Sequence, residues 1–249
     1  MPDCIALVTG ASKGLGWEAS RRLGALGMTV FAGARDPQRG QEAAATLRAG
    51  GADARFVPLD VTSEQSVRQA RDVIDAECGR LDVLVNNAGV SLEQEPGIRG
   101  VPSAVPAGLL RQTYEVNVFG VATVTRLMLP LLLRSAAARI VNVSTTMGSL
   151  TAWADPDSPQ RRYAPMLLAY DSSKAALNAL TLHYAAELAG TPVKVNSASP
   201  GYVATDLNGH RGTLQLGDEG SVSVIVRLAT AGADGPTGAF VSDEGPAAW

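Results

Sequence analysis

Cysteine and histidine are both scarce in this sequence of 249 residues, which has two of each. Cys4 and Cys78 show no paired spacing, and His183 and His210 do not cluster with them. Zinc sites and disulfide frameworks need several such residues at short, regular spacings. We therefore expect neither a metal site nor a disulfide framework.

An excess of basic residues is missing too, since 21 Lys and Arg against 24 Asp and Glu give a formal net charge of −3. Nucleic-acid-binding domains are typically strongly basic. The longest apolar run, LMLPLLL at 127–133, is too short to span a bilayer and contains Pro130. A strand-like segment begins at once in MPDCIALVTG, leaving no room for a signal peptide. We expect a cytoplasmic protein that binds neither nucleic acid nor membrane.

Short apolar segments alternate with longer helical patterns along the whole chain. They lack strict polar and apolar alternation, as expected of parallel strands that are buried on both faces. The segments read as strands are 4–10, 28–34, 54–60, 81–89, 138–144, 193–199 and 238–242. This order predicts an α/β fold, a doubly wound parallel sheet of about seven strands flanked by helices. With no linker or repeat, we expect residues 1–249 to form a single domain.

Three helices and two loops are expected between these strands. Residues 62–78 open with Thr62 and Gln65 in capping-box spacing, and long periodic helices are expected at 107–135 and 167–188. Two stretches, 91–107 and 150–165, are predicted to be irregular loops. Long loops in a compact domain are often functional.

A glycine-rich turn, TGASKGLG at 9–16, follows the first expected strand. Gly10, Gly14 and Gly16 allow a tight turn, close approach of the backbone to phosphate, and a helix start whose N–H groups face an anion. The spacing differs from the G-x-G-x-x-G fingerprint, and similar turns occur in α/β proteins that bind no nucleotide. The strand–turn–helix context favours a dinucleotide cofactor.

Residues after the second and third strands are expected near the adenosine of that cofactor. Arg35, together with Lys13 in the glycine-rich turn, favours NADP(H) over NAD(H), because cations accommodate a 2′-phosphate. An exposed loop arginine is the alternative for Arg35, and Asp36 is interpreted as the start of the next turn. Asp60 is placed to accept a hydrogen bond from the adenine amine, or it merely precedes a helix.

Two further patterns have structural and functional explanations. Asn86 and Asn87 end the fourth strand, where buried amides usually cross-link loops, and the small residues beside them would let a flat ring approach. Tyr170 and Lys174 are one helical turn apart, so their side chains share a face. Taken alone, this pair could be the amphipathic edge of a buried helix.

Four motifs nevertheless occur in register: TGASKGLG, NNAG at 86–89, Tyr170-x-x-x-Lys174 and SPGYVATD at 199–206. In this order they resemble the short-chain dehydrogenase/reductase family over essentially the whole chain. ARDPQRGQEAA and GPTGAFVSDEGP resemble its NADPH-dependent carbonyl reductase branch in particular. The resemblance implies a Rossmann-type fold and hydride transfer from NADPH to a small-molecule ketone or aldehyde.

The resemblance also implies four catalytic residues. Tyr170 would donate a proton to the carbonyl oxygen, while Lys174 would lower the pKa of the tyrosine and hold the nicotinamide ribose. Asn117 matches a helix asparagine that organises a water-linked proton path. Thr145 aligns with a serine that hydrogen-bonds the carbonyl, and it keeps the hydroxyl while adding a methyl group. Ser144 could substitute only if the register slipped by one residue.

Contacts to cofactor and substrate follow from the same resemblance. Met147, Trp153 and Tyr202 are expected to border a mostly apolar pocket that suits aromatic or aliphatic ketones and aldehydes. The expected cofactor-binding residues are Gly10, Ser12, Lys13, Gly14, Leu15, Gly16, Arg35, Asp60, Val61, Asn87, Ala88, Gly89, Tyr170, Lys174, Pro200, Gly201, Val203 and Thr205.

Residues 150–165 are expected to be an insertion near the active-site mouth, beside a helix that many relatives use for dimerisation. We therefore expect a monomer, or a dimer that uses another surface. Two alternatives to a reductase stay open. One is an NADP-dependent alcohol dehydrogenase acting in oxidation, and the other is a non-catalytic NADPH-binding regulator or scaffold. The presence of both Tyr170 and Lys174 favours an enzyme.

Overall fold

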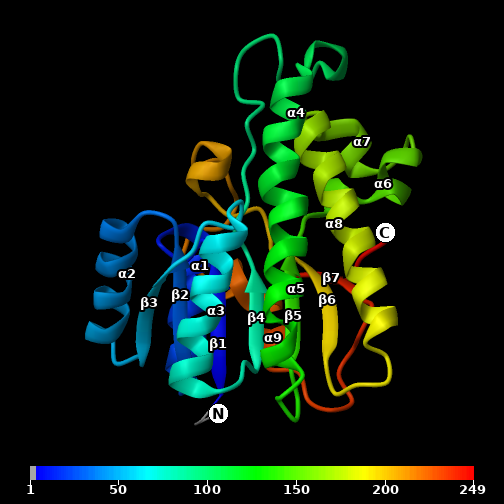
Figure 1. Ribbon diagram of the computed structural model, residues 1–249. Helices are drawn as coiled ribbons and strands as arrows, with labels where there is room; N and C mark the ends of the chain where they lie inside the picture. The colour runs from blue at the N-terminus through cyan, green and yellow to red at the C-terminus, as the bar shows by residue number, and fades with distance from the viewer. Residues whose placement is uncertain (1–3) are drawn as a thin grey trace.

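The computed structural model describes residues 4–249, and an eight-stranded sheet runs through its centre (Figure 1). The strand order is β3-β2-β1-β4-β5-β6-β7-β8, and all neighbours are parallel except β7 and β8. The strands are β1 (Ile5–Thr9), β2 (Thr29–Ala34), β3 (Ala54–Pro58), β4 (Val83–Asn86), β5 (Arg139–Val143), β6 (Lys194–Ser199), β7 (Phe240–Ser242) and β8 (Gly245–Pro246). The parallel doubly wound sheet is thus confirmed, with β8 as an unexpected antiparallel edge. Residues 1–3, part of the stretch from which no signal peptide is expected, lie outside the described residues.

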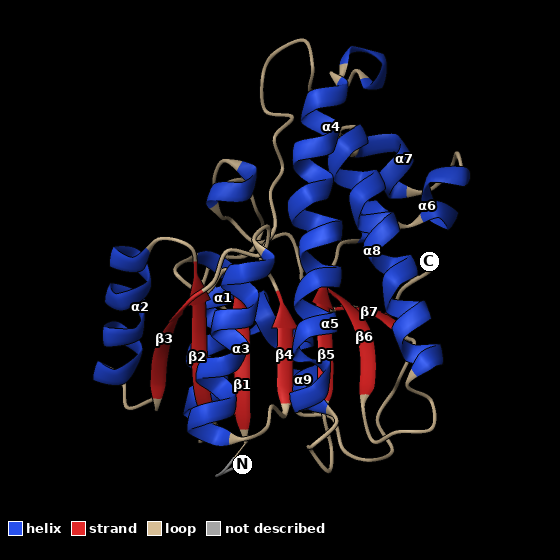
Figure 2. Cartoon of the chain, viewed as in Figure 1, coloured by secondary structure: helices blue, strands red, loops and turns tan. Residues whose placement is uncertain are grey.

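Helices cover both faces of this sheet (Figure 2). Helices α3, α5 and α8 pack on one face, and α1, α2 and α9 pack on the other. The α-helices are α1 (Gly14–Ala25), α2 (Pro37–Ala49), α3 (Glu64–Cys78), α4 (Ala107–Tyr114), α5 (Val121–Leu132), α6 (Leu150–Ala154), α7 (Pro159–Tyr163), α8 (Leu168–Glu187) and α9 (Ser223–Ala229). The shorter elements are η1 (Pro102–Ala104), η2 (Glu115–Gly120), η3 (Thr146–Gly148), η4 (Asp206–Asn208) and η5 (Glu219–Val222).

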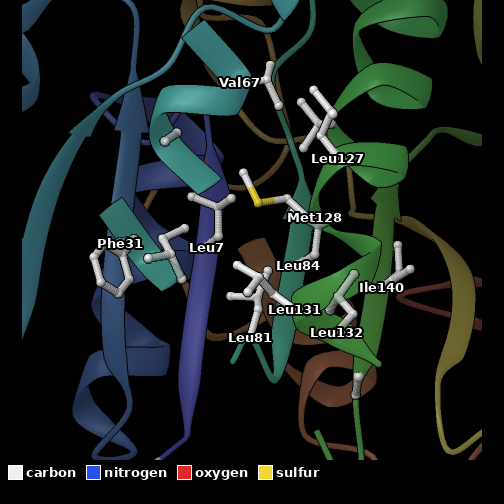
Figure 3. Close-up of a cluster of buried hydrophobic side chains, with 14 of the residues drawn as sticks. Leu7, Phe31, Val67, Leu81, Leu84, Leu127, Met128, Leu131, Leu132 and Ile140 are labelled. Atoms are coloured by element: carbon white, nitrogen blue, oxygen red, sulfur yellow. The ribbon is translucent and has the colours of Figure 1, made fainter. Parts of the chain in front are cut away.

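The core has two halves, one on each side of the sheet. On β1, Leu7 packs into the cluster under α3 and α5, whereas Ala6 and Val8 pack into the cluster under α1 and α9. In the first cluster Met128 and Leu84 lie between helix and sheet (Figure 3). Burying each large apolar side chain contributes roughly 1.5–3 kcal/mol. Burial on both faces explains why the strands are apolar throughout.

The expected helix at 107–135 is confirmed as the continuous run α4, η2 and α5, in which η2 is a π-helical segment. By length and composition alone, residues Ala107–Leu132 could cross a membrane. However, 56% of the most apolar window is buried inside the protein, as in the core helix of a folded domain. Single π-helical turns are frequent at functional sites, and this one contains Asn117.

Two local predictions were wrong. Helix α3 is capped by Ser63, which accepts from Ser66 N–H at 3.3 Å, because the Thr62 hydroxyl donates to Asp60 instead. Residues 150–165 form α6 and α7 rather than an irregular loop. Each of these short helices has a serine cap, Ser149 or Ser158, that accepts a hydrogen bond from its first turn.

The carboxyl ends of the parallel strands all point to one edge of the sheet, at the top of Figure 1. Strand order reverses between β1 and β4, where ligands bind in open α/β sheets. The glycine-rich turn, the end of β4, the turn after β5 and the first half of α8 meet at this edge.

Candidate active site

The glycine-rich turn is shaped by close backbone contacts. Gly10 has φ +65°, and a Cβ there would lie 3.0 Å from Ala88 Cα. A Cβ on Gly16 would lie 2.4 Å from Asn87 Nδ2. Glycine is therefore required at both positions, since the turn leaves no room for side chains. Helix α1 follows with Lys13 at its N-cap, where an ammonium cannot accept from the first helical N–H groups, and such a helix start suits a phosphate.

Asn87 ties this turn to the end of β4. Its Nδ2 donates to Thr9 O at 2.9 Å, and the Thr9 hydroxyl accepts from the backbone N–H groups of Asn87 and Ala88. The prediction that these amides cross-link neighbouring loops is confirmed for Asn87, whereas Asn86 donates to Asn142 on β5 and to Thr125 on α5. The Asn87 cross-link fixes a surface of small residues beside the glycine-rich turn.

A cavity of about 900 Å³ opens between these loops, within the usual size of ligand sites. Most of the predicted site residues line it, whereas Gly16, Asn117 and Trp153 do not. Those in the wall are Gly10, Ser12, Lys13, Gly14, Leu15, Arg35, Asp60, Val61, Asn87, Ala88, Gly89, Thr145, Met147, Tyr170, Lys174, Pro200, Gly201, Tyr202, Val203 and Thr205.

The two cations that were predicted to face the cofactor, Arg35 and Lys13, have different surroundings in the cavity wall. Arg35 is exposed in the wall, as expected. Lys13 instead forms an ion pair with Asp206 from the other side of the cavity, and its hydrogen bond lowers the pKa of that carboxyl. Asp36 accepts from Arg39 N–H at 3.1 Å as the cap of α2, which confirms that it starts the next turn.

Asp60 has the structural role that the sequence left open, whereas its hydrogen bond to an adenine amine stays a prediction. Its Oδ1 accepts from Thr62 N–H at 3.0 Å and from the Thr62 hydroxyl at 2.7 Å, which builds the turn before α3. The residue also lines the cavity. Part of its acceptor capacity is thus already used within the protein.

Tyr170 and Lys174 lie at the other end of the cavity, on the first two turns of α8. Lys174 Nζ lies 5.7 Å from the centroid of the Tyr170 ring and donates to Val143 O at 2.8 Å. Burial lowers the pKa of Lys174 to about 8. Burial, and after it the charge of Asp171, raises the pKa of Tyr170. The expected lowering of the tyrosine pKa is therefore not found here, because burial disfavours the charged phenolate.

Thr145 supplies a hydroxyl to this end of the cavity. Its Oγ1 accepts from Met147 N–H at 3.2 Å, whereas the Ser144 hydroxyl is buried and donates to Asn178 Oδ1 at 2.7 Å. The sequence missed Gly148, whose Cβ would lie 2.8 Å from the backbone carbon of Lys174. A glycine at this position lets the turn after β5 pack directly on α8.

Asn117 lies behind the cavity wall and is fully buried. Its side chain accepts from Val90 N–H at 2.8 Å and donates to Val90 O at 2.9 Å and to Ser173 Oγ at 3.0 Å. Ser173 in turn donates to Tyr170 O at 2.7 Å. The side chain therefore links the segment after β4 to the turn of Tyr170, and the predicted water-linked path stays a prediction.

Trp153 was expected to border the substrate but does not line the cavity. Because residues 149–154 turn into α6, its indole N–H points back and donates to Met147 O at 2.7 Å. The tryptophan thus supports the turn that carries Met147. Other residues of the predicted insertion line the cavity instead, namely Pro159, Gln160, Ala164 and Pro165.

Glu93 is a second residue that the sequence did not single out. Its buried carboxylate accepts from the backbone N–H groups of Ala169 and Tyr170. Its position in an irregular segment after β4 gave no local signal for this contact.

The geometry can be compared with known proteins. The chain is 31% identical to carbonyl reductase (NADPH) 1 of Rattus norvegicus, with 98% of each chain covered. It is 30% identical to (+)-neomenthol dehydrogenase of Arabidopsis thaliana, with 95% of each covered. The structure of NADPH-bound carbonyl reductase from chicken fatty liver is similar with a TM-score of 0.84 at 28% identity, over 100% of both chains. A family model described as short chain dehydrogenase matches residues 4–215, and with these similarities it shows that the chain belongs to the short-chain dehydrogenase/reductase family of oxidoreductases.

Proposed function

We propose that the chain is an NADPH-dependent carbonyl reductase with Tyr170, Lys174, Thr145 and Asn117 as its catalytic group. The observation that carries the proposal is one cavity whose wall holds a phenol, an ammonium and a hydroxyl from α8 and the turn after β5, and Arg35 from the turn after β2. Reduction of a carbonyl needs a hydrogen-bond donor and a proton donor at its oxygen. Thr145 and Tyr170 are the side chains suited to these tasks.

Each residue then has a defined role. The Tyr170 hydroxyl donates its proton to the carbonyl oxygen as negative charge develops there, and the Thr145 hydroxyl donates a hydrogen bond to the same oxygen. Lys174, buried and held by Val143 O, places a positive charge beside the phenol and would hold the nicotinamide ribose. Asn117 would support the proton path from behind the wall. Burial raises the pKa of Tyr170, so the phenol carries the proton that the reaction needs but is a weak acid. Proton transfer therefore depends on the positive charge of Lys174 and on charge developing at the carbonyl oxygen.

The cavity fits NADP(H). A glycine turn in which a Cβ on Gly10 would meet Ala88 leaves its backbone open to a pyrophosphate. Arg35 would hold the 2′-phosphate, and Val203 and Thr205 would contact the carboxamide. When bound, the reduced cofactor supplies the hydride for the carbonyl carbon.

A dehydrogenase acting in oxidation is the second candidate, favoured by the similarity to a protein named (+)-neomenthol dehydrogenase. Reduction needs Tyr170 to donate a proton and oxidation needs it to accept one, so the same side chain serves both directions. Met147 and Tyr202 in the wall support ketones and aldehydes with apolar groups as substrates.

We further propose a single-domain, cytoplasmic protein over residues 1–249. With residues 150–165 beside the cavity, it would be a monomer or a dimer through another surface.

Initial rates test the proposal. Loss of reduced-nicotinamide absorbance is followed with NADPH or NADH and a panel of ketones, aldehydes and quinones. Tyr170→Phe is compared with Tyr184→Phe, a control on the same helix outside the cavity wall. Turnover with NADPH that is lost in Tyr170→Phe and kept in Tyr184→Phe supports the reductase. Equal rates in all three proteins would contradict it, and NADPH binding without any turnover would point to the regulator.

A further inference from the structure

Glu93 faces the start of α8 with both oxygens of its carboxylate. Oε1 accepts from Ala169 N–H at 3.1 Å and Oε2 accepts from Tyr170 N–H at 2.9 Å, and the residue is 0% exposed. The first four N–H groups of a helix have no partner within the helix, so they need an acceptor from elsewhere. Glu93 supplies that acceptor to the residue that bears the phenol.

The helix cannot cap these groups itself. The N-cap residue of α8 is Leu167, whose side chain has no acceptor atom, whereas Ser, Thr, Asp and Asn are the usual residues at this position. The acceptor comes instead from a residue 76 positions earlier in the chain. A carboxylate is well suited to the task, since the N-terminus of a helix carries a partial positive charge.

The segment that contains Glu93 also borders the cavity. Ser91, Gln94 and Arg99 line the wall, and Gly100 N–H donates to Met166 O at 3.1 Å just before α8. The segment after β4 is thus attached to the start of α8 at two places. One attachment ends on the backbone of Tyr170.

A second buried carboxyl, Asp171, lies in the same helical turn. Its Oδ2 accepts from Leu167 N–H at 2.9 Å. Burial raises the pKa of Asp171 to about 7 against the opposing effect of the hydrogen bond from Leu167 N–H, and the charges of Glu93 and Arg99 make smaller contributions in opposite directions. Asp171 thus serves the N–H group of Leu167, while Glu93 serves those of Ala169 and Tyr170.

We propose that Glu93 is a positioning residue for Tyr170. By holding the tyrosine's own N–H group, it fixes the phenol relative to Thr145 and Lys174, and it makes that placement depend on docking of segment 91–101 against α8. The inference rests on the proposed function, in which Tyr170 donates the proton. Glu93 itself is buried behind the wall and does not touch the substrate.

The test compares Glu93→Gln and Glu93→Ala with Glu95→Gln, a matched change at an exposed glutamate of the same segment. Glutamine keeps one acceptor and nearly the same shape, whereas alanine removes both acceptors. Displacing a reacting group by about 1 Å can cost about a hundredfold in rate. We expect kcat to fall to about this extent in Glu93→Ala and less in Glu93→Gln, with an unchanged KM for NADPH.

Amide hydrogen exchange of a peptide covering residues 168–174 gives a second readout that does not depend on turnover. We expect protection in the wild type and faster exchange in both Glu93 variants, but not in Glu95→Gln. Faster exchange with an unchanged kcat would show that Glu93 only stabilises the helix start, and would overturn the proposal. Unchanged exchange and unchanged kcat would overturn it as well.

Two further outcomes are distinguished from failure of the Glu93 proposal: failure of the proposed function, and failure of the Glu93 variants to fold. If Tyr170→Phe keeps full turnover, the proposed function fails, and hydrogen exchange alone still decides whether Glu93 holds the helix start. If neither Glu93 variant folds, amide hydrogen exchange in the wild-type protein tests the proposal instead. Rapid exchange at residues 169 and 170 would overturn the proposal, and slow exchange would support it.

Discussion

The ammonium of Lys13 and the carboxylate of Asp206 form an ion pair that joins the glycine-rich turn to the segment after β6 across the cavity. Both side chains are more than half exposed, and Asp206 also pairs with His210 Nε2 at 2.8 Å. For Lys13 to face a 2′-phosphate, as the sequence predicts, it must leave Asp206. A 2′-phosphate bound by Lys13 would therefore compete with the ion pair that joins the two loops.

Asp206→Asn removes this competition. Exposed ion pairs are worth little, so we expect the KM for NADPH to fall by about two- to fivefold and the stability to change little. The measurement is the KM at low and at high ionic strength, because salt should shrink the difference between variant and wild type. A KM for NADPH that rises in Asp206→Asn would show that Asp206 helps binding rather than opposing it.

Arg35→Ala tests the cofactor preference. A lost hydrogen bond to a charged group costs roughly 1.5–3 kcal/mol, so kcat/KM for NADPH should fall at least about tenfold. The value for NADH should not fall, since NADH carries no 2′-phosphate. Arg71→Ala on α3, outside the cavity wall, serves as the control. Equal losses with both cofactors would contradict the assignment of Arg35.

Thr145 permits a comparison of near-isosteric side chains. Thr145→Ser keeps the hydroxyl and should retain most of kcat/KM, whereas Thr145→Val keeps the shape and should lose about a hundredfold. Valine also removes the acceptor for Met147 N–H, so thermal unfolding is measured beside the rates. Similar activity in the serine and valine variants would exclude a role for the hydroxyl.

Lys174→Met should abolish turnover and yet stabilise the fold near neutral pH. The pKa of Lys174 falls from 10.5 to about 8 in the folded chain because burial disfavours the charge. Between these pH values the unfolded chain binds the extra proton, so wild-type stability rises with pH over that window. The pKa difference corresponds to roughly 3 kcal/mol, of which the lost hydrogen bond to Val143 O offsets a part. The net gain in Lys174→Met should be largest below about pH 8 and fall towards pH 10.5. Denaturant unfolding at several pH values measures this gain in stability. A gain that does not depend on pH would contradict burial of the Lys174 charge as its cause.

The sheet and its ligand-binding edge could be predicted because their determinants are local. Strands buried on both faces carry apolar residues throughout, and Gly10 and Gly16 stand where backbone contacts exclude side chains. The helices at 150–165 also left signals that a loop assignment ignored. Ser149 and Ser158 each precede a short helix, and Pro159 occupies the first turn of the second one, α7.

Contacts between residues that are far apart in the sequence could not be predicted. Nothing near Glu93 indicates that it caps a helix beginning 75 residues later, and nothing near Lys13 indicates Asp206. The direction of Trp153 likewise depends on the fold of α6, which turns the indole towards Met147. Periodicity and motif spacing describe one segment at a time, whereas these side chains are placed by tertiary packing.

Tyr170 is the third residue of α8, which begins at Leu168. The ends of helices open before their centres and long before a buried sheet, because their backbone groups depend on partners outside the helix. On warming, we therefore expect the first turn of α8, which carries Tyr170, to open before the strands separate. If Tyr170 donates the proton, turnover should decline reversibly at temperatures at which the protein remains folded, and the stability of one helical turn would set the upper working temperature.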